Sequence, residues 1–244
     1  MRRMQFLKTK FAALLVGTLT LSGCDSAMLQ EVLDSAGSGS DSSQLSNDTI
    51  AAGLKEALTV GTGRVVDQLG SSGGFLNNPQ FRIPLPQSLQ TARDVAGKVG
   101  MAGYFDDLED KMNLAAEAAT PKARSMFVGA IKQLSFTDVM DIYRGSDDAA
   151  TQYLKGKMAE PLKGEMRPVV DNSLAEVGAV NSFNSLIKRY NALPMVDDVD
   201  ANLSDHVLEY ANSAIFSELA NQEALIRKDP VKRTTALLKQ VFGS

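Results

Sequence analysis

Apolar residues recur at spacings of three and four through most of the chain after residue 45, the pattern of helices with one buried face. The first such stretch begins at Ser46, Asn47 or Asp48, any of which can cap a helix, and the glycines of 70–74 end it. Its apolar face holds Ile50, Leu54, Leu58, Gly61, Val65 and Leu69.

The same spacing predicts further helices down to the C-terminus. We expect them at 87–100, 103–119, 121–134, 139–144, 149–177, 183–190, 204–226 and 231–241. Their expected N-caps are Thr120-Pro121, Ser146-Asp147-Asp148, Ser204 and Asp229-Pro230. Because proline removes a helical hydrogen bond, the helix at 149–177 is predicted to be kinked or broken at Pro161 and Pro168.

One stretch, 75–86, departs from the helical pattern. Its prolines disfavour helix at the residues before them, so residues 81–86 should be extended, with Phe81, Ile83 and Leu85 on one side against helices and Arg82 on the other. Lone prolines of this kind do not make a sheet. With no repeat of 20 to 50 residues, the chain from 46 to 244 is predicted to be one all-α domain of about eight helices.

The N-terminus has the layout of an export signal. Basic residues precede an apolar run at 11–21, which is shorter than the roughly 20 apolar residues that span a bilayer. Leu21-Ser22-Gly23-Cys24 then resembles the lipobox of bacterial lipoproteins, whose cysteine is acylated and becomes residue one after cleavage. We therefore expect a signal peptide at 1–23 and lipid on Cys24; the alternative is an ordinary signal followed by an unpaired thiol.

Residues 24–45 are predicted to form a Ser/Gly-rich flexible tether with a typical reach of about 25 Å. Asp25 directly after the cysteine resembles the signal that retains enteric lipoproteins in the inner membrane. The expected location is the cell envelope, anchored and facing the periplasm, with the inner membrane favoured over the outer.

The net charge of the mature chain limits the classes of partner that it can bind. The signal holds four of the 25 Lys and Arg and none of the 29 Asp and Glu, which leaves a mature charge of −8. Nucleic acid and anionic lipid are therefore disfavoured as partners of the domain. With Cys24 the single cysteine, there is no disulfide and no thiolate metal site.

Two motifs suggest chemistry, and both have a simpler interpretation. Residues 70–74 match G-x-S-x-G, but that hydrolase turn needs a preceding strand where a helix is predicted, and His206 would be the single available histidine base. A flexible Ser/Gly linker is favoured. Asp198, Asp200, Asn202 and Glu209 fall at positions 1, 3, 5 and 12 of a calcium-loop spacing. Leu203 stands where that loop needs glycine, so the start of a helix is favoured and no metal site is predicted.

Other charged and sulfur-containing residues have structural interpretations. The acidic run 106–110 is predicted to be a solvated helix face, and the methionines to fill the core. Arg64, Arg82 and Arg233 are candidates to hold an anion, although a single arginine is more often a surface charge.

Four segments, in order along 54–242, resemble the uncharacterised bacterial lipoprotein family called domain of unknown function 4197. They are Gly74–Pro79 with Arg82–Pro86, Ala115–Ala119, Gly145–Thr151, and Asp229-Pro230 with Arg233–Thr235. The resemblance implies no assigned activity, so it supplies no catalytic residue. The signature residues are Phe75, Leu76, Asn77, Asn78, Arg82, Pro84, Gly145, Thr151, Asp229 and Arg233.

Two function classes follow, with a third held open. A non-catalytic interaction or scaffold module is favoured, with an envelope protein as partner; the alternative is a helical carrier or sensor for an apolar molecule or lipid. An enzyme that uses carboxylates alone is the third and least favoured class, and no cofactor is implied. An enclosed apolar cavity would favour the carrier, a solid core with an exposed apolar surface the scaffold, and converging carboxylates the enzyme.

Overall fold

The computed structural model describes residues 46–243, and the predicted signal peptide, the predicted lipidation site Cys24 and the predicted tether lie outside the described residues. Within 46–243 there are α-helices and short 3₁₀ helices but no strand, which confirms the predicted all-α domain. The helices are α2 (Asn47–Leu69), α3 (Gln87–Gly97), α4 (Ala102–Ala119), η1 (Thr120–Lys122), α5 (Ala123–Lys132), α6 (Phe136–Arg144), α7 (Ala149–Glu176), α8 (Ala179–Tyr190), α9 (Leu203–Lys228), η2 (Pro230–Lys232) and α10 (Ala236–Phe242).

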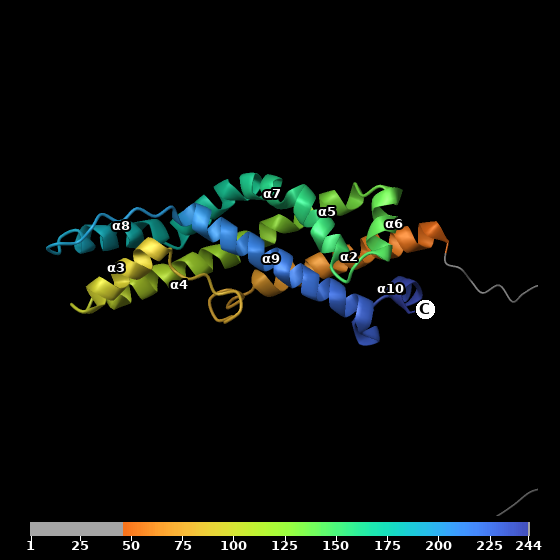
Figure 1. Ribbon diagram of the computed structural model, residues 1–244, viewed down its shortest axis with the longest axis horizontal. Helices are drawn as coiled ribbons and strands as arrows, with labels where there is room; N and C mark the ends of the chain where they lie inside the picture. Colours follow the sequence, from red (N-terminus) through yellow and green to blue (C-terminus); the bar gives the residue numbers. More distant parts are fainter. Residues whose placement is uncertain (1–45, 244) are drawn as a thin grey trace, which may run out of the picture. The chain divides into compact units, whose positions relative to one another are not determined.

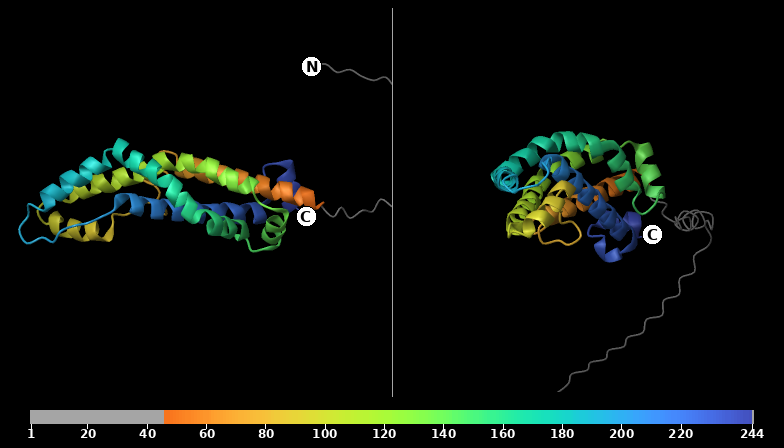
Figure 2. Two further views of the ribbon diagram at one scale, coloured as in Figure 1. Left: turned by 90° about the horizontal axis from the view of Figure 1, so that it is seen from above. Right: turned by 60° about the vertical axis from the view of Figure 1, so that its left-hand side comes forward.

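The longer helices run side by side around a continuous apolar core (Figure 1). Helix α9 packs along α7 and α2, while α4 packs on α7 and α8. Figure 2 shows α5 lying along α2, in agreement with their packing contacts. Phe75, Phe105 and Phe127 are fully buried, and Phe127 meets the ring of Phe216 on α9 edge-on at 5.6 Å.

Helix α2 follows the sequence expectation closely. Ser46 is its N-cap and accepts the N–H of Thr49, and Gly70 ends it. The predicted apolar face is buried from Ile50 to Leu69. Gly53 lets α10 pack close, because a Cβ there would lie 2.5 Å from Cγ2 of Val241.

Helix α7 is not broken at its prolines. It runs without interruption from Ala149 to Glu176 with Pro161 and Pro168 inside it, and its ribbon arches along its length (Figure 1). Both prolines lie on the exposed side. The carbonyls that lose their helical partner there can face water, so the packing of the buried side holds the helix together.

Several predicted N-caps are wrong. Thr120 has helical dihedral angles and donates to the Ala116 carbonyl, so the chain passes from α4 into α5 through η1 without a cap. Asn202 rather than Ser204 caps α9. Asp229 caps η2 instead of the last helix, whose cap is Thr235.

The buried face of α3 is Leu89, Ala92 and Ala96. Two apolar residues near the junction of α3 and α4 lie at the surface: Val99, beyond the end of α3, is 61% exposed, and Tyr104 is 44% exposed.

Candidate functional site

The signature segment 75–86 lies against α4 and is held by polar side chains of that helix. Oε1 of buried Glu117 accepts the backbone N–H groups of Phe75 and Leu76 at 3.0 and 2.9 Å. The fully buried Asn113 accepts the N–H of Ile83 and donates to its carbonyl, at 2.8 and 2.9 Å. A non-helical segment inside the domain must have its backbone groups paired, and α4 supplies the partners.

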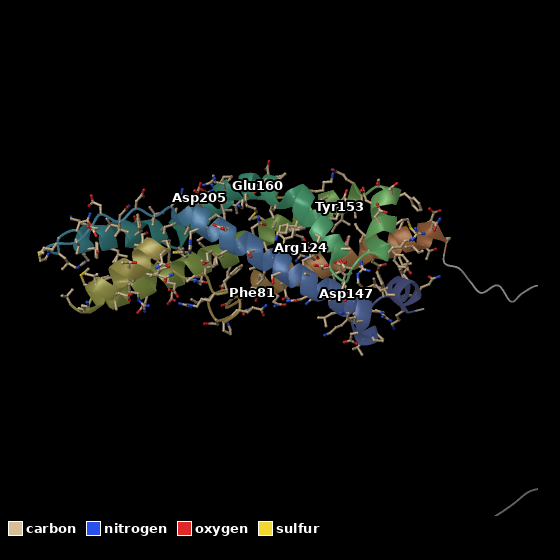
Figure 3. The ribbon with its side chains drawn as sticks, in the orientation of Figure 1. Phe81, Arg124, Asp147, Tyr153, Glu160 and Asp205 are labelled. Atoms are coloured by element: carbon tan, nitrogen blue, oxygen red, sulfur yellow. The ribbon has the colours of Figure 1, made fainter. Side chains whose placement is uncertain are left out.

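Burial along the segment alternates as predicted. Phe81, Ile83 and Leu85 are buried, whereas Arg82 is half-buried. Figure 3 labels Phe81 on this connection.

Arg82 does not face solvent alone. It pairs with Glu109 at 2.8 Å and Asp110 at 2.7 Å, and it also donates to the Leu76 carbonyl at 2.6 Å. The hydrogen bond to Asp110 raises the pKa of the guanidinium, which stays charged. The acidic run 106–110 is therefore an ion-pairing face rather than a merely solvated one; its remaining acids pair with Arg93 and Lys111.

The other residues of this signature segment shape its turns. Asn78 accepts the N–H of Gln80 through its side chain, and its carbonyl accepts those of Phe81 and Arg82. The N–H of Asn77 bonds to the carbonyl of Gly73, whose φ is +84°. The carbonyl of Pro84 is 2.7 Å from Nε2 of His206 on α9.

A buried ion pair on α9 connects this helix to the start of α7 and the end of α6. Glu223 on α9 accepts the N–H groups of Ala150 and Thr151 and the Thr151 hydroxyl, at 2.9 to 3.0 Å. Arg227, one turn later, pairs with Glu223 at 2.9 Å and donates to the carbonyl of Ile142 at the end of α6. The carboxylate thus meets the positive end of α7 and the guanidinium the negative end of α6.

This arrangement corrects the expected cap of α7. Asp148 occupies the cap position, but its side chain accepts from the side chain of Gln152 and from no backbone N–H of the helix. Glu223 accepts those N–H groups from another helix. Gly145 ends α6, and a Cβ there would lie 2.6 Å from that of Ala149. Arg233 donates to the carbonyls of Ile226 and Arg227 and so caps the end of α9.

The calcium-loop spacing does not produce a cation site. Asn202 caps α9 and bonds to Asp205, so its side chain belongs to the helix start, and Glu209 lies within the exposed part of α9. Ser88 donates to the backbone carbonyl of Asp200. Among residues 46–243, no group of three or more His, Cys, Asp or Glu side chains is placed to hold a metal ion.

The G-x-S-x-G motif at residues 70–74 also lacks the geometry of a hydrolase site. Gly70–Gly74 follows a helix, as expected. The His206 side chain hydrogen-bonds to the Pro84 carbonyl, and the centres of the His206 and Tyr210 rings lie 4.7 Å apart with the rings tilted by 38°. Within the described part of the chain, four serines donate to carboxylates: Ser135 to Asp138, Ser146 to Asp148, Ser182 to Asp107 and Ser204 to Asp171. Ser182 also accepts a hydrogen bond from Lys111 at 2.6 Å. The hydrogen bond from Lys111 lowers the pKa of Asp107, which makes this carboxylate a poor proton acceptor.

The apolar hollows are too small for a lipid or metabolite. One between α4, α7 and α9 has a cavity volume of about 20 Å³, and one between α2, α9 and α10 about 10 Å³. These volumes are the size of a water molecule, whereas ligand pockets enclose roughly 300 to 1,000 Å³.

Larger hollows are open at the surface. Between α5 and α7 lies a groove of about 450 Å³, which we call the α5–α7 groove. Its α5 side is Met126, Gly129, Ala130, Gln133 and the following Leu134. Its α7 side is Tyr153, Lys157 and Pro161 over a floor of Leu154, Met158 and Leu162. Figure 3 labels Tyr153 and Glu160 on α7.

A second open cleft of about 490 Å³ lies between α4 and α8. Its walls are polar and include Lys111 and Arg189, and its one acidic lining residue is Asp107. Carboxylates therefore do not converge there. Of the two clefts, the α5–α7 groove is the one with an apolar floor.

None of the described helices combines the length and the apolar character needed to cross a membrane. The fold and its buried polar contacts define an all-helical domain whose signature residues hold its own backbone together. Residues 44–243 match the family described as "Protein of unknown function (DUF4197)", and the chain belongs to this family, which confirms the resemblance. Searches of curated proteins and of solved structures returned no match.

Proposed function

We propose that this protein is a non-catalytic interaction module, anchored through lipid on Cys24 at the periplasmic face of the cell envelope, with the inner membrane favoured. A partner protein from the envelope docks in the α5–α7 groove. The tether leaves the folded domain free to reach this partner.

The observation that carries the proposal is a filled interior beside an open apolar groove. The signature side chains Arg82 and Arg233 donate hydrogen bonds to the domain's own backbone, and the buried Glu117 and Glu223 accept hydrogen bonds from it. The α5–α7 groove, in contrast, leaves Met126, Ala130 and Tyr153 half-exposed. The water-sized apolar hollows give the carrier alternative no support.

An affinity pull-down of the native chain with a groove-blocking variant tests the proposal. A Cβ at Gly129 meets nothing within 4 Å, so Gly129→Leu fills the groove without strain in the fold. The same holds at Gly164, which lies on α7 outside the groove and provides a matched control. We expect a co-purifying envelope protein that Gly129→Leu loses and Gly164→Leu keeps. A bound lipid at one per chain, retained in both variants, would instead establish a carrier.

The anchor has its own test. Cys24→Ser is expected to lose incorporation of an acyl-chain analogue and to leave the membrane fraction, since the thiol is the acceptor of the diacylglycerol. Stable anchoring needs two or more chains. Sucrose-gradient fractionation of the wild type then assigns the membrane. Acyl label retained on the serine variant would contradict the anchor.

A further inference from the structure

We infer that the partner in the α5–α7 groove is an amphipathic helix with acidic flanks, supplied by another protein. This inference rests on the proposed function and specifies its partner. It draws on the spacing, the small residues and the charge of the groove walls.

The two walls are helical ridges of matching length. On α5 the positions are 126, 129, 130 and 133, an i, i+3, i+4, i+7 stripe, and on α7 they are 153, 157 and 161, an i, i+4, i+8 stripe. At 1.5 Å per residue these stripes extend about 10 and 12 Å. A groove between two such ridges receives about two turns of a third helix through anchors with the same spacing.

Small residues allow that helix to come close. Gly129 and Ala130 stand side by side on the α5 wall, and the space where a Gly129 Cβ would point is open. Large apolar side chains of the incoming helix can therefore lie across α5 and reach the floor at Leu154 and Met158. An acyl chain is the poorer fit, because small-molecule sites enclose most of their ligand and this groove is open along its length.

The charge of the groove is opposite to that of the domain. Residues 46–243 carry 21 Lys and Arg against 25 Asp and Glu, yet no acidic residue lines the groove. Lys157 is the single charged residue that lines the groove, and its ammonium lies 5.8 Å from the centre of the Tyr153 ring. The nearby Asp138 accepts from the backbone and hydroxyl of Ser135, and its charge also interacts with that of Lys157. The groove therefore favours a helix with acidic flanks.

Two designed helical peptides of about 18 residues provide the probe. Both carry the same leucine stripe; one has glutamate on its flanks and the other lysine. Binding to the full mature chain in detergent is measured by fluorescence anisotropy at low and high salt. We expect micromolar binding of the acidic peptide, about tenfold tighter than the basic one and weakened by salt.

Three variants separate the contributions. Gly129→Leu should abolish binding of the acidic peptide, and Gly164→Leu should leave it unchanged. Lys157→Glu should weaken the affinity for the acidic peptide about tenfold and strengthen the affinity for the basic peptide. Circular dichroism of each variant verifies the fold.

The outcomes distinguish the two proposals. If Gly129→Leu blocks both peptides and neither charge is preferred, the groove remains the docking surface and the acidic partner is wrong. If neither peptide binds while the native pull-down still depends on Gly129, the helical partner is wrong and the interaction module stands. Binding to vesicles of anionic phospholipid in place of the acidic peptide, lost in Lys157→Glu, also overturns the inference.

Discussion

Glu223→Ala is expected to destabilise the domain by about 3–5 kcal/mol, one of the two largest single-residue effects we expect. Removing one partner of a buried ion pair leaves the other charge without compensation, and this has a cost of that size. Here the remaining charge is Arg227, whose side chain is 11% exposed. The start of α7 would also lose the acceptor of its Ala150 and Thr151 N–H groups.

Urea denaturation measures this effect. Glu160→Ala on α7 is the control, because the Glu160 side chain is 85% exposed and its substitution should change the free energy of unfolding by less than about 0.5 kcal/mol. Glu223→Gln should fall between the two, since its amide keeps one oxygen acceptor but loses the charge. A Glu223→Ala protein as stable as the Glu160→Ala protein would show that α7 does not depend on this cap.

The features predicted correctly from the sequence are those that depend on residues close together in the chain. The face of α2 was predicted, and its cap Ser46 was one of three candidates, because apolar spacing and capping involve residues within a few positions. The alternation of Phe81, Ile83 and Leu85 followed from the prolines around them.

The wrong predictions involve partners distant in sequence. Asp148 was expected to cap α7, but Glu223, far along the chain, supplies the acceptor. Arg82 lies on the side opposite the buried residues as expected, but its ion pairs with Glu109 and Asp110 were not predicted. The prolines of α7 were expected to kink or break it, and no break occurs, because packing against α9 and the exposure of both rings outweigh the lost hydrogen bonds.

The sequence analysis also did not identify Glu109, Asn113 and Glu117 as the residues of α4 that hold the segment 75–86. They recur every four residues along α4 next to its buried stripe, and all three contact the segment 75–86. A polar line at helical spacing beside a buried face was the available signal. The α5–α7 groove gave no such signal, because Met126 and Ala130 have the spacing of core residues and their exposure depends on where α7 lies.

Ile83→Ala is expected to destabilise the domain by about 2–5 kcal/mol. The Ile83 side chain is fully buried, and truncation at a packed site removes its transfer free energy and leaves a cavity. Its backbone is fixed on both sides by Asn113, so the segment cannot easily move to fill the space. Arg82→Ala is expected to cost only about 1 kcal/mol, because the Leu76 carbonyl would lose a donor.

Thermal and urea denaturation of the two variants, with the pull-down repeated on each, separates a structural segment from a partner-binding arm. If residues 75–86 line the core, Ile83→Ala lowers the midpoint well below that of Arg82→Ala, and both retain the groove-dependent partner at temperatures where they are folded. If the segment is a binding arm, Ile83→Ala melts like the wild type and loses the partner. Since Glu117 and Asn113 hold the segment through paired backbone groups in the interior, we expect the first result.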